Sequence, residues 1–333
     1  MLTSRPDLRK LPGRWLGARG LVWLGARGLV WLGAHGVVRW LGARGVAMVA
    51  ATAAALIVVA PSSALAAPAA GQFPAAAAPL VGVSGGELVA AGTGRRLWAR
   101  DANVARPMGS ITKVMTALVV LEAGDLGREI RVTRAAVRYV DSTGASSAGL
   151  IAGDVLTARQ LLEAMLVPSG CDAAYLLATA YGPGRAAFIR KMNAMARAIG
   201  LTSSHFASFD GMPFPTEFST YSSPADLIRL GERAMRNSVF RGIVAQRSYF
   251  LPATGRHHAY LWYTTNGLIG NYRGAIGIKT GNTIAAGFCL LFEARRRGHT
   301  LIGVVLHADP TSGGLASAVR AAEQLLNWGF RRV

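Results

Sequence analysis

An apolar run near the N-terminus decides how much of this chain is available to a folded domain. Residues 46–60 contain a single polar side chain, Arg39 and Arg44 precede them, and Ala64 and Ala66 follow with one residue between them. A basic segment, a short apolar run and such a small-residue pair are typical of a secretory signal. The run is shorter than the ~20 residues that span a bilayer. We therefore expect export with cleavage after Ala66, and a retained anchor is the alternative.

The residues before that run carry a short internal repeat. Trp-Leu-Gly-Ala begins at Trp15, Trp23, Trp31 and Trp40. The period is far below the roughly 20–50 residues of a solenoid repeat, so we interpret the segment as low complexity. A basic-aromatic segment lying at a membrane interface is the alternative. We assign residues 1–66 to the repeat and signal, 67–81 to an Ala/Pro-rich linker, and 82–333 to one folded domain.

Charge and cysteine content exclude several classes of protein. The 333 residues include 36 Lys+Arg and 17 Asp+Glu, a net charge of +19, of which +7 lies in residues 1–66. The rest is scattered arginine without a nucleic-acid-binding module, so we expect no nucleic-acid partner. An anionic wall or membrane surface is the expected neighbour of an exported basic domain. Two cysteines cannot make a disulfide scaffold. The six histidines lack metal-ligand spacing, and we expect neither a metal nor a cofactor.

Hydrophobic periodicity predicts an α+β domain. The expected elements are a hairpin over 86–97, a helix over 110–123, four helices between 158 and 237, three strands within 277–307, and a last helix over 315–328. Strands at both ends with helices between them favour an antiparallel sheet flanked by helices.

Ser110 and Lys113 open the strongest helical pattern of the chain. A spacing of three puts the Ser110 hydroxyl and the Lys113 amine on one face of that helix. The helix start offers unpaired N–H groups and a positive dipole end, which favour a neutral lysine and an oxyanion beside the serine. The pair is a candidate nucleophile and general base. An N-cap serine followed by a solvated lysine is the alternative.

A second lysine lies in the strand-like sequence Gly-Ile-Lys-Thr-Gly of residues 277–281. Lys279 and Thr280 on an edge strand can bind a carboxylate, and Gly281 lets a ligand backbone approach closely. Only four of the 36 basic residues are lysines. Where arginine serves for positive charge, a retained lysine indicates a need for its smaller, deprotonatable amine. An ordinary turn after a strand is the alternative.

Ser169, Gly170 and Cys171 form a short turn between two expected helices. A serine hydroxyl there can pass a proton between a general base and a leaving group. We do not expect Cys171 to be a nucleophile, because the sequence places no histidine or other base beside it. In an exported protein Cys171 and Cys289 are candidates for a disulfide. We favour two buried thiols, because the sequence does not establish that they are close.

One further serine motif is set aside. Residues 82–86 match GxSxG, a pattern that presents a nucleophile between a strand and a helix. Here an Ala/Pro-rich linker precedes the pattern and a hairpin follows it. We therefore expect Ser84 to be structural.

The three motifs, in this order, resemble the SxxK, SxN and KTG set of penicillin-recognising serine enzymes. Residues 106–117 resemble the nucleophile helix of serine-type D-alanyl-D-alanine carboxypeptidases, the low-molecular-mass penicillin-binding proteins. Similar flanks surround the other motifs, and the likeness runs from about Gly82 to Phe330. It implies an α+β fold of the β-lactamase/transpeptidase type, with a mainly helical subdomain that carries the middle motif. Residues 82–333 would then be the catalytic domain.

The resemblance also implies roles for the matching residues. Ser110 would attack the penultimate carbonyl of the D-Ala-D-Ala end of a peptidoglycan stem peptide, with Lys113 as general base. Ser169 would relay the proton to the departing D-Ala. β-Lactam antibiotics would acylate the same serine.

Substrate binding would fall to the strand motif and its neighbours. Lys279 and Thr280 would hold the terminal carboxylate beside Gly281, and the N–H groups of Asn282 and Ser110 would form the oxyanion hole.

One position departs from the family pattern. Cys171 stands where the third residue of the middle motif is usually Asn, and a thiol is a weaker hydrogen-bonding group than an amide. The rate could fall by roughly 10²–10³, the scale for losing one oriented polar group. The alternative function is therefore a catalytically weak penicillin- or wall-binding homologue. A β-lactamase is less favoured, because Glu217, the nearest candidate for a deacylating Glu, lacks the expected surroundings.

Overall fold

The computed structural model describes residues 77–309, 311 and 313–333. The repeat, the expected signal and most of the expected linker lie outside these residues. No helix within the described part is both long and apolar enough to cross a bilayer.

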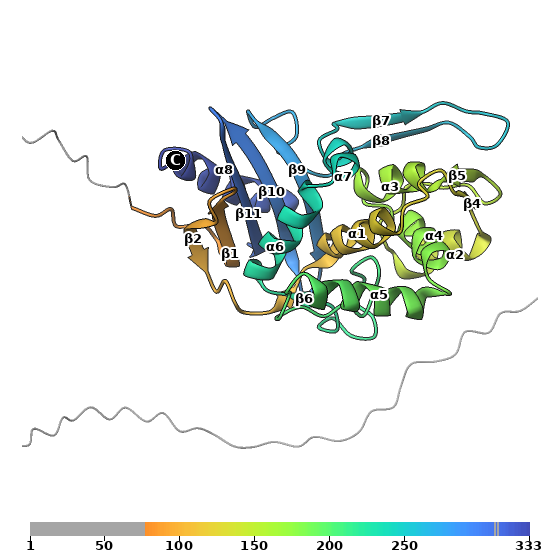
Figure 1. Cartoon of the computed structure of the whole chain (residues 1–333), viewed down its shortest axis with the longest axis horizontal. Coiled ribbons are helices and arrows are strands. Elements are labelled where there is room, and N and C mark those ends of the chain that lie inside the picture. The colour runs from red at the N-terminus through yellow and green to blue at the C-terminus, as the bar shows by residue number, and fades with distance from the viewer. Residues whose placement is uncertain (1–76, 310, 312) are drawn as a thin grey trace, which may run out of the picture. The chain divides into compact units, whose positions relative to one another are not determined.

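A five-stranded antiparallel sheet forms one half of the described structure (Figure 1). Its strand order is β2-β1-β11-β10-β9, so the two ends of the domain pair through β1 and β11. The strands are β1 (Val83–Ala90), β2 (Arg95–Arg100), β9 (Ala275–Thr283), β10 (Gly287–Arg296) and β11 (His299–Ala308).

Both faces of this sheet are covered, and the strand sequences reflect it. Along β11, Leu301 and Val305 belong to one buried cluster and Ile302 and Val304 to another. Successive side chains of a strand point to opposite faces, so a strand buried on both sides needs a nearly continuous apolar run. The runs that predicted these strands are of this kind.

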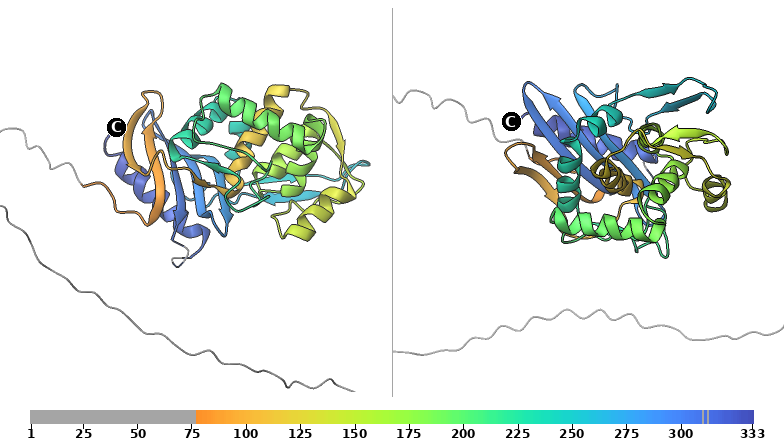
Figure 2. Two further views of the ribbon diagram at one scale, coloured as in Figure 1. Left: turned by 90° about the horizontal axis from the view of Figure 1, so that it is seen from below. Right: turned by 45° about the vertical axis from the view of Figure 1, so that its right-hand side comes forward.

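Helices α8 (Leu315–Gly329) and α6 (Pro224–Met235) lie on the two faces of the sheet (Figures 1 and 2). Helix α8 buries small and large apolar residues at helical spacing, among them Ala318, Ala322 and Leu325. Helix α6 approaches the sheet closely because Gly231 faces it; a Cβ there would lie 3.0 Å from Ile302.

A mainly helical part adjoins the other side of α6. Its central helix, α1 (Lys113–Ala123), is buried over most of its length. The surrounding helices are α2 (Arg134–Thr143), α3 (Ala158–Leu166), α4 (Cys171–Tyr181), α5 (Arg185–Ala198) and α7 (Ser238–Val244). Three short strand pairs complete it: β3 (Arg106–Pro107) with β6 (Tyr221–Ser222), β4 (Glu129–Arg131) with β5 (Val155–Thr157), and β7 (Ser248–Leu251) with β8 (Tyr260–Tyr263).

The expected fold class is confirmed, with differences in detail. The helix expected from Ser110 begins with a 3₁₀ turn, η1 (Gly109–Thr112), and becomes α-helical only at Lys113. The expected strands are longer than their apolar cores, because pairing extends into polar ends such as Asn282. Helices α2 and α7 and the short strand pairs were not expected. Helix α7 and the strand pairs are too short to show a sustained apolar period. Helix α2 does bury Ala136 and Val140 one turn apart, and this pattern was overlooked.

Candidate active site

The nucleophile turn places Ser110 and Lys113 in contact. Ser110 lies in η1 and is partly exposed, whereas Lys113 begins α1 and is fully buried. The Lys113 Nζ lies 2.6 Å from the Ser110 Oγ, at hydrogen-bond distance. A spacing of three residues is one turn of 3₁₀ helix, in which side chains i and i+3 eclipse each other. The local sequence therefore accounts for this contact.

The middle motif reaches the same lysine from the start of α4. The Lys113 Nζ is 3.4 Å from the Ser169 Oγ and 3.2 Å from the Cys171 Sγ. Ser169 has a positive φ of 69°, an uncommon conformation for a residue other than Gly, Asn or Asp. Such strained positions cluster at functional sites. The motif thus meets a group that lies more than fifty residues earlier in the chain.

The segment before α3 holds this turn in place. Ser146 donates from its hydroxyl to the Ser169 carbonyl at 2.6 Å, and its own carbonyl accepts from the Cys171 N–H at 2.7 Å. Asp172, buried at the first turn of α4, accepts from the backbone N–H groups of Ala148 and Leu150. The residues before and after Gly170 are therefore both hydrogen-bonded to the loop of residues 146–150.

Strand β9 contributes the second lysine. Lys279 is buried, and its Nζ lies 3.2 Å from the Thr280 carbonyl oxygen and 3.3 Å from the Thr280 Oγ1. Burial lowers the pKa of Lys279 well below its usual value, and the charge of Lys113 lowers it further. The Thr265 hydroxyl lies 2.6 Å from that of Thr280. Lys279 and Thr280 thus lie together on the strand that borders the nucleophile turn.

Glycines allow β9 to approach the nucleophile turn at backbone distance. A Cβ on Gly281 would lie 2.2 Å from the Met108 carbonyl oxygen and 3.1 Å from the Ser110 nitrogen. A Cβ on Gly109 would lie 2.6 Å from the Asn282 nitrogen, and Gly109 has a positive φ of 54°. Both positions therefore require glycine. The nitrogens of Ser110 and Asn282 lie on the two segments that meet here.

A third segment supports the turn from the side of the helical part. A Cβ on Gly211 would lie 2.0 Å from the Gly109 carbonyl oxygen, so Gly211 also packs against the turn. The neighbouring Asp210 accepts from the Tyr139 hydroxyl at 2.8 Å. Burial raises the pKa of Tyr139, and the Asp210 carboxylate raises it further. Tyr139 therefore stays a neutral hydrogen-bond donor in this wall.

The two cysteines are separate and buried. Cys171 and Cys289 are free, as we favoured from the sequence. The reason given for dismissing Cys171 as a nucleophile was incomplete, because a base, Lys113, lies beside it in space. Burial raises the pKa of Cys171, although Lys113 opposes this. At 1% exposure its sulfur does not face a substrate.

Sequence reasoning missed several supporting residues: Ser146, Thr265, Tyr139 and Asp210. None lies in a motif, and their partners are far away in the chain. Only the surplus of hydroxyl residues around 146 was a signal. Within the described residues, no group of three or more His, Cys, Asp or Glu side chains is arranged to hold a metal.

The geometry defines a class of enzyme. A partly exposed serine in contact with a buried lysine, with a second serine on that lysine and a Lys-Thr-Gly strand alongside, is the arrangement of active-serine acyl-transfer enzymes.

Comparison with known proteins identifies the family. A family model described as D-alanyl-D-alanine carboxypeptidase, peptidase S11, matches residues 80–310. The D-alanyl-D-alanine carboxypeptidase of Streptomyces sp. (strain K15) is 40% identical over 291 residues, covering 83% of this chain and 98% of that protein. DacB2 of Mycobacterium tuberculosis is 37% identical over 240 residues, covering 72% and 79%. The chain belongs to the peptidase S11 family of serine-type D-alanyl-D-alanine carboxypeptidases.

Solved structures agree with this assignment. The crystal structure of the Streptomyces K15 DD-transpeptidase superposes with a TM-score of 0.71 at 40% identity, covering 76% of this chain and 98% of that one. The fold is therefore the α+β transpeptidase fold. Members of this family act on the D-Ala-D-Ala ends of peptidoglycan stem peptides.

Proposed function

We propose that this protein is an exported serine peptidase that removes the terminal D-Ala from peptidoglycan stem peptides through an acyl-serine intermediate. The observation that carries the proposal is the 2.6 Å contact between the Lys113 Nζ and the Ser110 Oγ. A serine hydroxyl is a weak nucleophile until a neighbouring base takes its proton. Among the described residues, Lys113 is the lysine hydrogen-bonded to the Ser110 hydroxyl.

Acylation begins at Ser110. Its Oγ bonds to the carbonyl carbon of the penultimate D-Ala while Lys113, in its neutral form, takes the hydroxyl proton. The C–N bond then breaks, and the departing amine receives a proton from Lys113 through the Ser169 hydroxyl. The 3.4 Å separation of Lys113 Nζ and Ser169 Oγ supports this relay. Free D-Ala leaves, and the acyl group remains on Ser110.

Deacylation uses the same base. Lys113 takes a proton from an incoming water, the water oxygen bonds to the ester carbon, and the proton returns to Ser110 as the ester breaks. An amine can replace the water, and the acyl group then passes to a second peptide. The Streptomyces K15 relative is named both a carboxypeptidase and a DD-transpeptidase, which supports water and a peptide amine as the two acceptors of the acyl group.

Substrate binding falls to β9. Lys279 and Thr280 would bind the terminal carboxylate, which suits a cation and a hydroxyl on one strand. The N–H groups of Ser110 and Asn282 would stabilise the oxyanion of the tetrahedral intermediate, because Gly109 and Gly281 let the two segments meet.

Two alternatives carry different expectations. A weakened wall-binding homologue would retain acylation but turn over slowly, because Cys171 gives Lys113 a poor partner. For a β-lactamase, Glu217 would have to serve deacylation; it instead accepts from the Ala285 N–H at 3.3 Å. We therefore place the β-lactamase last.

The test is to incubate the full chain with labelled penicillin, and separately with a peptide ending in D-Ala-D-Ala. We expect label on Ser110 and release of D-Ala, both lost in Ser110→Ala and both kept in Ser84→Ala. Acylation without D-Ala release would favour the weak binder. Rapid loss of the penicillin label as hydrolysed product would favour the β-lactamase. A folded protein that is not acylated would contradict all three.

Export is a separate part of the proposal. The basic and apolar N-terminal sequence ending at Ala66 supports a secretory signal. Expression of the full chain in a bacterium with fractionation and N-terminal sequencing would test it; a cytoplasmic, uncleaved product would contradict export with cleavage.

A further inference from the structure

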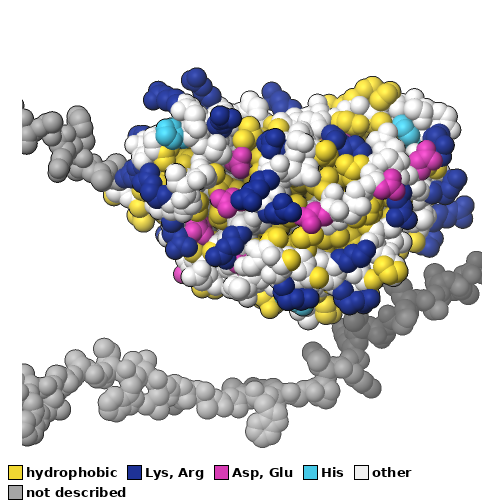
Figure 3. All heavy atoms as spheres, in the orientation of Figure 1, with side chains coloured by type: hydrophobic (Ala, Val, Ile, Leu, Met, Phe, Trp, Pro, Cys, Tyr) yellow, Lys and Arg dark blue, Asp and Glu magenta, His cyan; other side chains and the backbone are white. Residues whose placement is uncertain are grey.

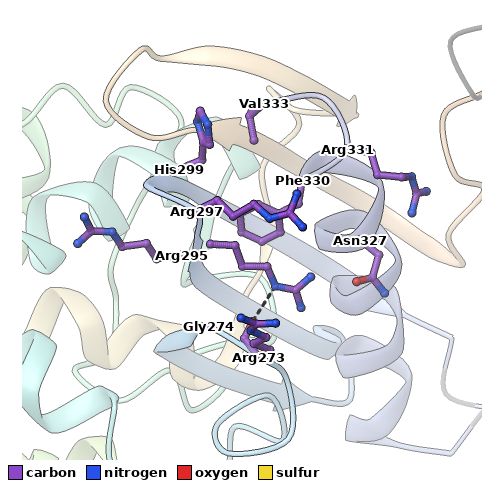
Figure 4. A pocket seen from close by; sticks show the side chains of 10 residues that line it. Arg273, Gly274, Arg295, Arg297, His299, Asn327, Phe330, Arg331 and Val333 are labelled. Atoms are coloured by element: carbon purple, nitrogen blue, oxygen red, sulfur yellow. Dashed lines mark hydrogen bonds between the residues drawn. The ribbon is translucent and has the colours of Figure 1, made fainter. Parts of the chain in front are cut away.

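An arginine-lined cavity lies at the end of the sheet away from the active-site residues of β9 (Figure 4). Its volume is about 680 Å³, and its walls come from the two residues before β9, the end of β10 with the turn to β11, and the end of α8 with the residues after it. Lys279 lies four residues into β9 from Ala275, and Gly281 six. At about 3.3 Å per residue, the cavity and the nucleophile turn are separated by roughly 20 Å of strand. The cavity is therefore distinct from the catalytic site.

The cavity concentrates positive charge without acidic partners. Five arginines line it and no acidic side chain does: Arg273, Arg295, Arg296, Arg297 and Arg331. No ion pair to a described residue is formed by any of the five. Like charges gathered this way repel unless an anion lies among them.

Two of these arginines face the centre of the cavity. Figure 4 shows Arg297 extending over Phe330 and Arg273 at the lower edge of the hollow beside Gly274, whereas Arg295 and Arg331 point away to the two sides. The fifth, Arg296, is held by the protein: its Cζ lies 4.1 Å from the Tyr272 ring centroid, and its Nε donates to the Arg273 carbonyl. Arg273 and Arg297 are both exposed and do not point away from the cavity, so they are the donors available to a ligand there.

The turn that carries Arg297 is unfavourable for an arginine. Arg297 and Gly298 form the two-residue connection between β10 and β11, with φ values of 50° and 83°. Turns with two positive φ values favour Asn, Asp or Gly at the first position. The backbone conformation of this turn therefore does not explain an arginine at position 297. Its guanidinium lines the cavity, which indicates a role there.

The surroundings favour a lipid phosphate as the ligand. Phe330 and Val333 add apolar surface to the rim, which suits the boundary between a headgroup and acyl chains. The chain enters the described structure on the same helix, because the Trp328 Nε1 donates to the Ala77 carbonyl at 2.9 Å. Basic side chains are also spread over the face of the molecule shown in Figure 3.

We propose that this arginine cavity binds the phosphate of anionic phospholipids and holds the catalytic unit against the membrane surface. The proposal rests on export, which belongs to the proposed function, and not on the chemistry at Ser110. Guanidinium groups match phosphate oxygens in geometry and charge. Each basic residue near an anionic membrane contributes about a fivefold gain in binding.

The test measures binding of the full chain to phosphatidylcholine vesicles with and without phosphatidylglycerol. The pocket variant is Arg273→Gln with Arg297→Gln. The matched control is Arg190→Gln with Arg197→Gln, two exposed arginines of α5. All three proteins share the N-terminal segment, so differences between them report on the substituted arginines alone. Penicillin acylation of Ser110 in solution serves as the folding control and should be equal in all three.

We expect the pocket variant to lose roughly twentyfold in affinity for phosphatidylglycerol vesicles, and the control to stay within about twofold. Equal losses in both variants would indicate general charge and overturn the proposal, as would no loss in either. In a second arm, soluble polyglycerol phosphate replaces the vesicles. Pocket-dependent binding of that polymer without a gain on phosphatidylglycerol vesicles would assign the cavity to a wall polymer and overturn the lipid assignment. Unequal acylation would indicate that the pocket variant is misfolded. In that case the second variant is Arg273→Lys with Arg297→Lys. It keeps the positive charge and should retain vesicle binding.

Discussion

The amine of Lys113 lies 3.2 Å from the thiol of Cys171, and both groups are buried behind the partly exposed Ser110. Lys113 is therefore surrounded by the Ser110 and Ser169 hydroxyls and one thiol. A thiol accepts hydrogen bonds weakly and does not offer the paired donor and acceptor of an amide. The proposed base is consequently oriented chiefly by the two serines.

Cys171→Asn should raise turnover of a D-Ala-D-Ala peptide by about tenfold. The amide would accept a hydrogen bond from Lys113 and donate one to the substrate, and an amide is a stronger hydrogen-bonding group than a thiol. Steady-state release of D-Ala measures the effect. The control is Cys289→Ser, whose hydroxyl can still donate to the Ala286 carbonyl. Unchanged turnover in Cys171→Asn would mean that another group already orients the base.

Lys113→Arg should lower the rate of Ser110 acylation by at least about 10³-fold, within the range for loss of a general base. Arginine keeps the positive charge but does not lose its proton in proteins, so it cannot accept the hydroxyl proton. The rate of labelling by penicillin measures the loss. Lys191→Arg is the matched substitution, because Lys191 is exposed and donates to the Tyr181 carbonyl. An acylation rate preserved in Lys113→Arg would show that Lys113 acts only through its charge.

Gly281→Ala should lower kcat/KM by about 10²-fold. The added Cβ meets the Met108 carbonyl at 2.2 Å, so β9 must move away from the nucleophile turn. A displacement of about 1 Å at a reacting group costs this much. Gly242→Ala is the control: it lies within α7 with open space around it and should stabilise the fold by about 0.5–1 kcal/mol. Wild-type kinetics in a folded Gly281→Ala protein would contradict the close approach.

Glu293→Gln should remove part of the pH dependence of stability. Burial raises the pKa of Glu293 to about 7, the nearby Glu232 carboxylate adds to this, and Arg241 opposes it. Because the folded pKa is raised, this carboxyl stabilises the fold fully below its unfolded value near 4.5, and the contribution is lost as pH rises through 7. The loss amounts to about 3 kcal/mol.

Urea unfolding at pH 5 and pH 8 measures this difference. The wild type should lose more stability than Glu293→Gln between the two values, whereas Glu122→Gln, which changes a surface carboxylate, should follow the wild type. Parallel curves for the wild type and Glu293→Gln would show that Glu293 ionises normally.

Much of the fold was predictable because its signals are local. The apolar period over 315–328 and the runs within 277–307 are present in the sequence and need no partner to be recognised. Helix α7 and the short strand pairs were missed because their residues are held by contacts from elsewhere. Strand β8, for example, is anchored by the Tyr260 hydroxyl, which donates to the Asp154 carboxylate of a distant loop.

The candidate site divides in the same way. The pairing of Ser110 with Lys113 follows from one helical turn, and it was predicted from their spacing alone. The arrangement around Lys113 required the rest of the fold, because Ser169 is 56 residues away in sequence. Thr265 and Ser146 carry no motif, so nothing in the sequence marked them as neighbours of Thr280 and Cys171.

The sequence by itself determined the alternation of strands and helices, the turn that joins Ser110 to Lys113, and the scarcity of lysine that marked Lys113 and Lys279. Only the tertiary structure decided that α1, the start of α4 and β9 meet at one point, that the two cysteines stay apart, and that five arginines gather at the far end of the sheet. The physical reason is range. Spacing within one turn or strand is set by backbone geometry, whereas contacts between distant segments depend on how the whole core packs.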